Sequence, residues 1–290
     1  MATLRSDPGQ LRSTAEGLVA EAAAFVRRRR AEVFGAGAAE SSPEPLIQTK
    51  SSPTDPVTVV DTETERFIRD RLTQLRPGDA VLGEEGGESG DVSGREPGAV
   101  TWVVDPIDGT VNFMYGVPAY AVSVAAQVGG VSVAGAVADV VGDRIYSAGV
   151  GLGAQVSDRQ GTAVLRCTDV TELSMALLGT GFGYSPRRRA AQAALLAELL
   201  PAVRDVRRIG SAALDLCMVA AGRLDAYFEH GIKPWDHAAG SLIAAEAGAR
   251  VLLPGPDIDG GTVIVAAAPG IADEFIALLQ RAGGLAPIPE

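Results

Sequence analysis

The sequence predicts an α/β protein whose antiparallel-rich N-terminal half is followed by an α/β C-terminal half. From residue 100 to about 165, short apolar stretches are separated by Gly-Gly and Gly-Asp pairs, as in an antiparallel meander. After about residue 170, helical and strand-like segments alternate, which favours sheets covered by helices. The 290 residues can bury a sizeable core. We expect one folded unit over 1–290, with halves of about 1–165 and 166–290.

The N-terminal half begins with a predicted helix. Asp7-Pro8 is typical of an N-cap followed by a proline in the first helical turn. Apolar residues then recur at helical spacing: Leu11, Ala15, Leu18, Ala22 and Phe25. The arginines at 27–30 indicate a solvated helix end, where cations complement the helix dipole.

A loop and a second helix come next. Residues 35–56 are rich in Gly, Pro and Ser and predict a loop. The pair Thr58 and Asp61 predicts a capping box at the start of a helix whose apolar stripe reaches Leu75. A short strand at 80–83 leads into the glycine- and acid-rich segment 83–98. We expect that segment to be a lid or a metal-binding loop.

The remaining elements follow from local pattern. Strands are expected at 100–104, 119–128, 131–141 and 144–148. In the C-terminal half, helices are expected at 190–200, 212–222, 237–249 and 271–281, and strands at 203–209, 225–230, 250–253 and 262–267.

Composition narrows the class of protein. The net charge of −11 argues against direct nucleic-acid binding, and an acidic protein that handles phosphate needs metal cations. No apolar run approaches the roughly 20 residues of a membrane helix, and the N-terminus lacks a signal-peptide profile. Cys167 and Cys217 are interpreted as small buried hydrophobes in a reducing compartment. We therefore expect a cytoplasmic enzyme.

The stretch WVVDPIDGTVNF, residues 102–113, carries the first chemical signal. Asp105 and Asp108 follow an apolar strand, and Pro106 predicts a turn there. Two half-buried carboxylates this close are costly unless cations neutralise them, and Mg²⁺ prefers such oxygen ligands. Gly109 and Thr110 would then offer backbone N–H groups to an anion. The structural alternative is an ordinary Asp-Gly turn with Asp108 as an N-cap.

Other acidic residues are candidates, each with a structural alternative. Glu84 and Glu85 follow the strand at 80–83, although such a pair in a loop is often only solvated. Asp236, in KPWDHAAG, could be an ordinary helix N-cap, and Asp61 has its capping role in any case. The two histidines lack the spacing of a nucleophile or zinc site. His237 is expected in a first helical turn and His230 as a partly exposed neighbour of the site.

These stretches together resemble the inositol monophosphatase family, and most closely its bacterial inositol-1-monophosphatase branch. Besides 102–113, the resemblance rests on G-E-E at 83–85 and on W-D-H-A-A-G-S-L-I-A-A-E-A-G-A at 235–249. The segments K-S-S-P-T-D-P-V-T-V-V-D at 50–61 and R-R-I-G-S-A-A-L-D-L-C at 207–217 also fit, in order. It covers nearly the whole chain. The fold implied is a layered αβαβα sandwich of the sugar-phosphatase type, in a single catalytic unit.

The resemblance also implies a metal site with two to three Mg²⁺ ions. Glu84, Asp105 and the backbone carbonyl of Ile107 would hold the first ion. Asp105, Asp108 and Asp236 would hold the second, and a third, weaker ion would lie near Glu84. Asp61 and Thr110 resemble the pair that positions the attacking water, so the catalytic roles fall on Thr110, Asp61 and Glu84.

Substrate contacts are implied as well. The amides of Gly109 and Thr110 would bind phosphate oxygens, residues 210–212 and Glu229 would contact the inositol ring, and Arg207 would support that loop. The positions expected to bind substrate are Glu84, Ile107, Asp108, Gly109, Thr110, Arg207, Gly210, Ser211, Ala212, Glu229 and Asp236. Family members are commonly homodimers inhibited by Li⁺. The segment 86–97 departs from the family motifs, which bears on the weaker metal and the lithium response.

The expected reaction is Mg²⁺-dependent hydrolysis of myo-inositol-1-phosphate, a small phosphorylated polyol, by metal-activated water. The same metal cluster serves relatives that hydrolyse fructose-1,6-bisphosphate, a 3′-phosphoadenosine nucleotide or histidinol phosphate. A different class of function is that of a binding partner of the transcription machinery.

Overall fold

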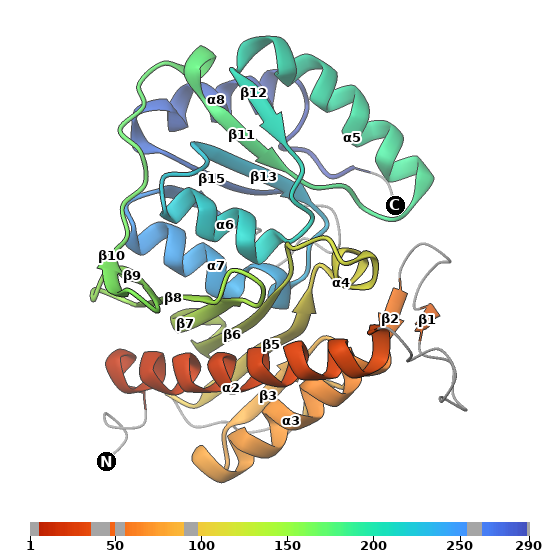
Figure 1. Cartoon of the computed structure of the whole chain (residues 1–290). Helices are drawn as coiled ribbons and strands as arrows, with labels where there is room; N and C mark the ends of the chain where they lie inside the picture. The colour runs from red at the N-terminus through yellow and green to blue at the C-terminus, as the bar shows by residue number, and fades with distance from the viewer. Residues whose placement is uncertain (1–5, 36–46, 50–55, 90–97, 254–262, 289–290) are drawn as a thin grey trace.

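Helices and sheets alternate in layers across the molecule (Figure 1). The computed structural model describes residues 6–35, 47–49, 56–89, 98–253 and 263–288. Helices α2 and α3 cover one face of a large sheet, and α6 and α7 lie between that sheet and a smaller one. Helices α5 and α8 pack on the outer face of the smaller sheet. This arrangement confirms the layered α/β sandwich.

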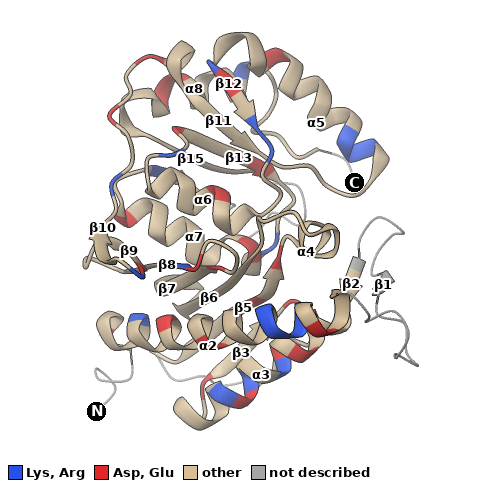
Figure 2. Cartoon of the chain, in the orientation of Figure 1, with Lys and Arg blue, Asp and Glu red and all other residues tan. Residues whose placement is uncertain are grey.

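Helix α2 (Pro8–Phe34) begins as the sequence predicts, because the Asp7 side chain accepts a hydrogen bond from the Gln10 amide. The helix does not end at arginines 27–30 as predicted, although Arg27 and Arg28 are exposed as expected. The helix continues to Phe34, and the arginines reach neighbouring elements. Arg29 pairs with Glu63, and Arg30 Nε donates to the carbonyl of Phe113. These arginines form the basic segment near the C-terminal end of α2 (Figure 2).

Two short strands lie within the predicted loop at 35–56 and just beyond it. Strand β1 (Ile47–Thr49) pairs antiparallel with β2 (Pro56–Thr58). The loop positions 36–46 and 50–55 lie outside the described residues. Helix α3 (Val59–Leu75) follows, and the predicted capping box is present, with Thr58 as N-cap and Asp61 at the third helical position.

The large sheet has the strand order β10-β9-β8-β7-β6-β5-β3-β4. Its strands are β3 (Ala80–Gly83), β4 (Gly87–Ser89), β5 (Val100–Asp108), β6 (Ala121–Val128), β7 (Val131–Asp139), β8 (Arg144–Gly149), β9 (Ala154–Asp158) and β10 (Gly161–Val164). Consecutive strands from β5 to β10 pair antiparallel, which confirms the meander, whereas β3 and β5 are parallel. Of the predicted lid, residues 87–89 are an edge strand and 90–97 lie outside the described residues.

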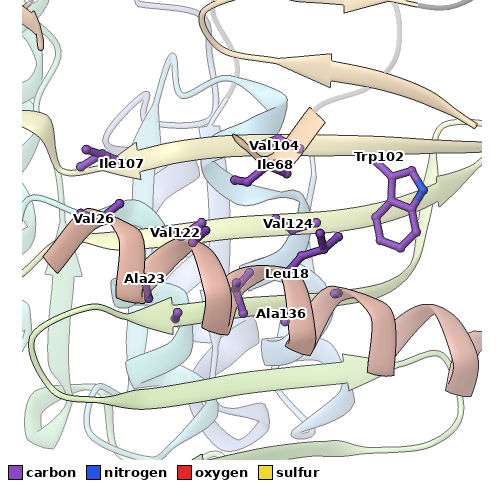
Figure 3. Close-up of a cluster of buried hydrophobic side chains, with 14 of the residues drawn as sticks. Leu18, Ala23, Val26, Ile68, Trp102, Val104, Ile107, Val122, Val124 and Ala136 are labelled. Atoms are coloured by element: carbon purple, nitrogen blue, oxygen red, sulfur yellow. The ribbon is translucent and has the colours of Figure 1, made fainter. Parts of the chain in front are cut away.

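One core cluster fills the space between α2, α3 and the large sheet (Figure 3). Leu18 and Val26 of α2 and Ile68 of α3 face Val104 and Val122 of the sheet, and all are buried. Burying such side chains stabilises a fold by about 1.5–3 kcal/mol each. This packing holds the C-terminal end of β5, from which Asp105 and Asp108 project.

The smaller sheet has the order β12-β11-β13-β15-β14. Its strands are β11 (Leu177–Thr180), β12 (Asp205–Arg207), β13 (Ala226–His230), β14 (Arg250–Leu252) and β15 (Val263–Ala267). The helices of this half are α5 (Pro186–Leu199), α6 (Ala212–Ala220), α7 (Pro234–Glu246) and α8 (Pro269–Arg281). Strand β11 runs parallel to β12 and β13, and the other pairs are antiparallel. Strands and helices thus alternate along this half as predicted, although β11 was not among the expected strands.

Candidate active site

Three carboxylates meet where β5 ends. One oxygen each of Asp105, Asp108 and Asp236 lie within 4.8 Å of one another. The sequence predicts that strand β5 ends at residue 104, but the strand runs to Asp108 and contains a bulge. Asp105 pairs with Ser123 and Asp108 with Ala121, so β5 holds one residue more than its partner strand. In a regular strand, residues three apart face opposite sides of the sheet. The extra residue of the bulge allows both aspartates to face the same side.

Hydrogen bonds orient each of the three carboxylates. Asp105 Oδ1 accepts from the Ile107 amide at 3.0 Å. Asp108 Oδ2 accepts from Ser211 Oγ at 2.6 Å and from the Ala213 amide at 2.7 Å, so it also caps the start of α6. Asp236 lies at the third position of α7 and accepts from the Lys233 amide, so the helix begins earlier than predicted.

The electrostatics of this cluster favour a bound cation. Burial raises the pKa of Asp105 well above its usual range, and the charges of Glu84, Asp108 and Asp236 add to the rise. Burial likewise raises the pKa of Asp108 to about 6, and that of Asp236 rises with it. A divalent cation reverses this cost, since it stabilises the ionised forms. Because all the donors are carboxylate oxygens, the cluster fits a hard cation.

Glu84 comes from the neighbouring parallel strand. It follows β3 directly, and its amide donates to the carbonyl of Val104 at 3.3 Å. Its carboxylate contacts Asp105 and raises the pKa of that residue. The structure therefore brings Glu84 to the cluster, as the resemblance implied, whereas the amide of Glu85 is bound to a buried side chain of α3, Glu65.

Asp61 and Thr110 are in contact. Thr110 Oγ1 lies 3.0 Å from Asp61 Oδ1 and 3.1 Å from the carbonyl of Ile107. The other oxygen of Asp61 accepts from the amide and hydroxyl of Thr58. Burial raises the pKa of Asp61 to about 6. The capping role and the contact with Thr110 therefore belong to the same carboxylate.

The two glycine-containing loops of the site pack against each other. Gly109 and Gly210 have φ angles of 94° and 93°, in the left-handed region that favours glycine. A Cβ on Gly109 would lie 3.1 Å from the carbonyl oxygen of Gly210. Asn112 Nδ2 donates to the carbonyl of Ile209 at 2.9 Å and joins α4 (Thr110–Tyr115) to the loop that precedes α6.

Glu229 projects from β13 toward the same region. Its Oε2 accepts from the Tyr227 hydroxyl at 2.6 Å, and burial raises its pKa to about 7. Its charge and that of Asp108 act on each other. A Cβ on Gly181 would lie 1.9 Å from Glu229 Oε2, so only glycine leaves room for this carboxylate.

Arg207 and His230 differ from expectation, whereas His237 does not. Arg207 pairs with Asp205 on β12, whereas Nη1 of Arg208 would lie 2.3 Å from a Cβ on Gly210. The arginine that lies against the 210–212 loop is therefore Arg208. The prediction that His230 is partly exposed is wrong, because β13 turns it into the core, where Nε2 lies 2.8 Å from the carbonyl of Gly284. His237 lies in the first turn of α7, as predicted.

The inositol monophosphatase family model matches residues 7–283. The chain belongs to the inositol monophosphatase family.

Curated relatives and solved structures agree with this assignment. The chain is 68% identical over 286 residues to "Inositol-1-monophosphatase SuhB" of Mycobacterium tuberculosis H37Rv, and the match covers 98% of each chain. A solved structure of Mycobacterium tuberculosis SuhB has a TM-score of 0.81 at 64% identity, covering 96% of this chain and 99% of that one. "Nus factor SuhB" of Pasteurella multocida is 39% identical over 242 residues, which cover 81% of this chain and 86% of that protein. The protein is a phosphatase.

Some residues of this inositol monophosphatase family member were not singled out from its sequence. Asn112 donates to the carbonyl of Ile209, 97 residues away, whereas Tyr227 and Arg208 are each two residues from the site residue that they contact. Gly181 follows β11, a strand that the sequence pattern did not predict, so its close approach to Glu229 had no signal in the sequence. Among the helices that the structure describes, none combines the length and apolar character needed to cross a bilayer.

Proposed function

We propose that this phosphatase hydrolyses myo-inositol-1-phosphate to inositol and phosphate in an Mg²⁺-dependent reaction. The observation that carries the proposal is that the carboxylate cluster lies close to two other groups. These are the Asp61–Thr110 pair, which is suited to orienting a water, and Glu229, which is suited to binding hydroxyl groups.

The cluster supplies the metal ligands in this proposal. Glu84, Asp105 and the carbonyl of Ile107 would hold one ion, Asp105, Asp108 and Asp236 a second, and Glu84 would contribute to a third, weaker one. When bound, Mg²⁺ would polarise the phosphate ester, lower the pKa of a bound water and stabilise charge on the leaving oxygen. The hydrogen bonds at Asp105 and Asp108 orient these ligands from the backbone and from Ser211.

The Asp61–Thr110 pair would orient the attacking water. An ionised Asp61 only accepts hydrogen bonds, so Thr110 Oγ1 donates its proton to Oδ1 at 3.0 Å. The lone pairs of Thr110 then remain able to accept a hydrogen bond from water, which directs the water oxygen toward phosphorus. Attack in line with the leaving oxygen requires no covalent intermediate with the enzyme.

The two glycine loops and Glu229 would bind the substrate on either side of the scissile bond. The amides of Gly109 and Thr110 would contact phosphate oxygens, and residues 210–212 would contact the ring. Glu229, ionised above a pH of about 7, would accept hydrogen bonds from ring hydroxyls. A polyol phosphate would therefore be preferred over a simple alkyl phosphate, which offers no such donors.

The test is phosphate release by the purified protein with Mg²⁺ on four substrates side by side. They are myo-inositol-1-phosphate, fructose-1,6-bisphosphate and 3′-phosphoadenosine-5′-phosphate, with histidinol phosphate as a fourth comparison. We expect the inositol ester to give the highest kcat/KM. A preference for another ester would keep the metal mechanism and overturn the role given to Glu229. Undiminished release in EDTA would overturn the metal mechanism itself.

A second candidate function is suggested by the relative named as a Nus factor, which is 39% identical to this chain. We propose to test it by using an Asp108→Asn variant to capture polymerase components from a lysate. Recovery of polymerase would support a binding role that is independent of catalysis, and its absence would remove that role. Homodimer formation, lithium inhibition and a cytoplasmic location stay predictions.

A further inference from the structure

A buried glutamate of α3 binds the backbone directly after Glu84. Glu65 is only 2% exposed, and each of its carboxylate oxygens accepts a hydrogen bond from a backbone amide. Oε2 accepts from the Glu85 amide at 2.7 Å, and Oε1 accepts from the Gly86 amide at 2.8 Å. The Glu84 amide itself donates to Val104 of β5 at 3.3 Å. Three successive amides are thus held, one by the sheet and two by Glu65.

Two glycines make room for this carboxylate. A Cβ on Gly83 would lie 2.5 Å from Glu65 Oε1, and a Cβ on Gly86 would lie 2.7 Å from the same atom. At distances this short, a side chain at either position would push the Glu65 carboxylate out of its place, so both glycines leave room for it. The sequence G-E-E-G therefore places its acidic residues around the end of a side chain from another element.

Arg69 neutralises Glu65 and extends the contact. Its Nε donates to Glu65 Oε1 at 2.8 Å, one helical turn away. Its Nη2 donates to the carbonyl of Gly87 at 2.6 Å, and Nη1 contacts the hydroxyl of Ser89. Without this cation, Glu65 would add an uncompensated buried charge close to an acidic site. The pair instead binds the β3–β4 turn with a neutral net charge.

Helix α3 also carries the residue that binds Thr110. Asp61 and Glu65 are four residues apart and therefore project from the same face of the helix, and both are buried. Asp61 contacts Thr110, and Glu65 contacts the segment after Glu84. One rigid helix is therefore hydrogen-bonded to two separate segments of the site.

We propose that Glu65, supported by Arg69, is a positioning residue that holds Glu84 at the metal site. Through α3 it also fixes Glu84 relative to the Asp61–Thr110 pair. The inference rests on the proposed role of Glu84 as a metal ligand. Its physical basis is that the charge-assisted hydrogen bonds to residues 85 and 86 restrict the backbone on which the Glu84 carboxylate is carried.

The test compares Glu65→Gln with Glu63→Gln. The glutamine has the same shape but offers only one acceptor oxygen, so one of the two bound amides loses its partner. Glu63 lies on the same helix and pairs with Arg29, away from Glu84, so its variant controls for the loss of one charge on α3. Two measurements are made on each protein: hydrogen exchange of residues 84–89 without metal, and the Mg²⁺ concentration that gives half-maximal phosphate release.

For Glu65→Gln we expect exchange of the 85 and 86 amides to accelerate about tenfold or more. We expect the half-saturating Mg²⁺ concentration to rise about 10- to 100-fold, with a smaller change in kcat at saturating Mg²⁺. Glu63→Gln should leave both unchanged. Unaltered exchange and an unaltered Mg²⁺ requirement in Glu65→Gln would overturn the inference. A wild-type enzyme that needs no Mg²⁺ would instead overturn the proposed function, and the metal-free exchange experiment would still decide whether Glu65 anchors the segment.

If Glu65→Gln does not fold, as judged by circular dichroism and thermal unfolding, Arg69→Gln provides the test. This variant keeps both hydrogen bonds from the backbone amides to Glu65 but removes the hydrogen bond from residue 69 to the carbonyl of Gly87. We expect faster exchange at residues 86–89 and a several-fold higher Mg²⁺ requirement, with partial recovery in Arg69→Lys. A normal Mg²⁺ requirement in Arg69→Gln would overturn the inference.

Discussion

Replacing Asp61 with asparagine separates the structural role of this carboxylate from its role beside Thr110. Asp61 accepts hydrogen bonds at both oxygens, from Thr58 at one and from Thr110 at the other. Asparagine has one acceptor oxygen. If that oxygen keeps the capping bond to Thr58, its NH₂ group faces Thr110, and the Thr110 hydroxyl must turn toward the carbonyl of Ile107, which lies 3.1 Å away. Thr110 then has a lone pair fewer to offer to water.

The effect on stability has a sign that depends on pH. Burial raises the pKa of Asp61 from 3.8 to about 6, which corresponds to about 3 kcal/mol against the ionised form in the folded state. The folded-state pKa exceeds the unfolded value, so Asp61 favours the folded state only while it is protonated. The free energy of unfolding of the metal-free wild type therefore falls by about 3 kcal/mol as pH rises from about 4 to about 6. Asparagine avoids that loss but gives up a hydrogen bond, at a cost of about 1–3 kcal/mol. The variant should be less stable than wild type at pH 4 and as stable or more stable at pH 8.

The assay is urea unfolding in EDTA at both pH values, together with kcat at saturating Mg²⁺. We expect the stability difference between variant and wild type to change by about 3 kcal/mol between pH 4 and pH 8 in favour of asparagine. The kcat should fall about 100- to 1000-fold. Asp70→Asn, an exposed change on the same helix, should alter neither quantity. A kcat within a few-fold of wild type would refute the role of Asp61 in positioning water, and a difference independent of pH would refute its costly ionisation.

Three further predictions concern the metal cluster and the substrate pocket. Asp108→Asn or Asp236→Asn should nearly abolish phosphate release while the circular dichroism spectrum stays unchanged; unimpaired Mg²⁺-dependent turnover in either would contradict their role. Gly181→Ala should raise KM for inositol phosphate about tenfold, with less effect on p-nitrophenyl phosphate, because its Cβ displaces Glu229. An equal effect on both substrates would contradict the role of Glu229. Saturating Mg²⁺ should raise the Tm of the metal-free protein by about 5 °C at pH 8 and by less at pH 5, because the raised pKa values leave the clustered carboxylates partly protonated at pH 5. The same rise at both pH values would argue that the ion binds elsewhere.

Much of the fold was predictable because its signals are local. The Asp7 cap, the Thr58–Asp61 capping box and the glycine-separated meander each depend on residues within a few positions of one another. The prediction failed where partners are distant. Arginines 27–30 look like a solvated helix end, but Arg29 and Arg30 find partners 34 and 83 residues away. Such contacts depend on how α2 lies against α3 and α4, and no local pattern records that.

The candidate site divides in the same way. Local sequence pattern identifies the acidic candidates, because each follows a strand or opens a helix in a recognisable motif. Asp105 and Asp108 share one side of β5 because of a bulge that depends on pairing with β6, and local pattern does not reveal this bulge. The packed fold is also needed to show that Glu65 of α3 holds the turn after Glu84, and that Arg208 rather than Arg207 faces Gly210. The physical reason is that sequence pattern specifies secondary structure over a few residues, whereas a catalytic arrangement requires layers far apart in the chain to pack at a defined register.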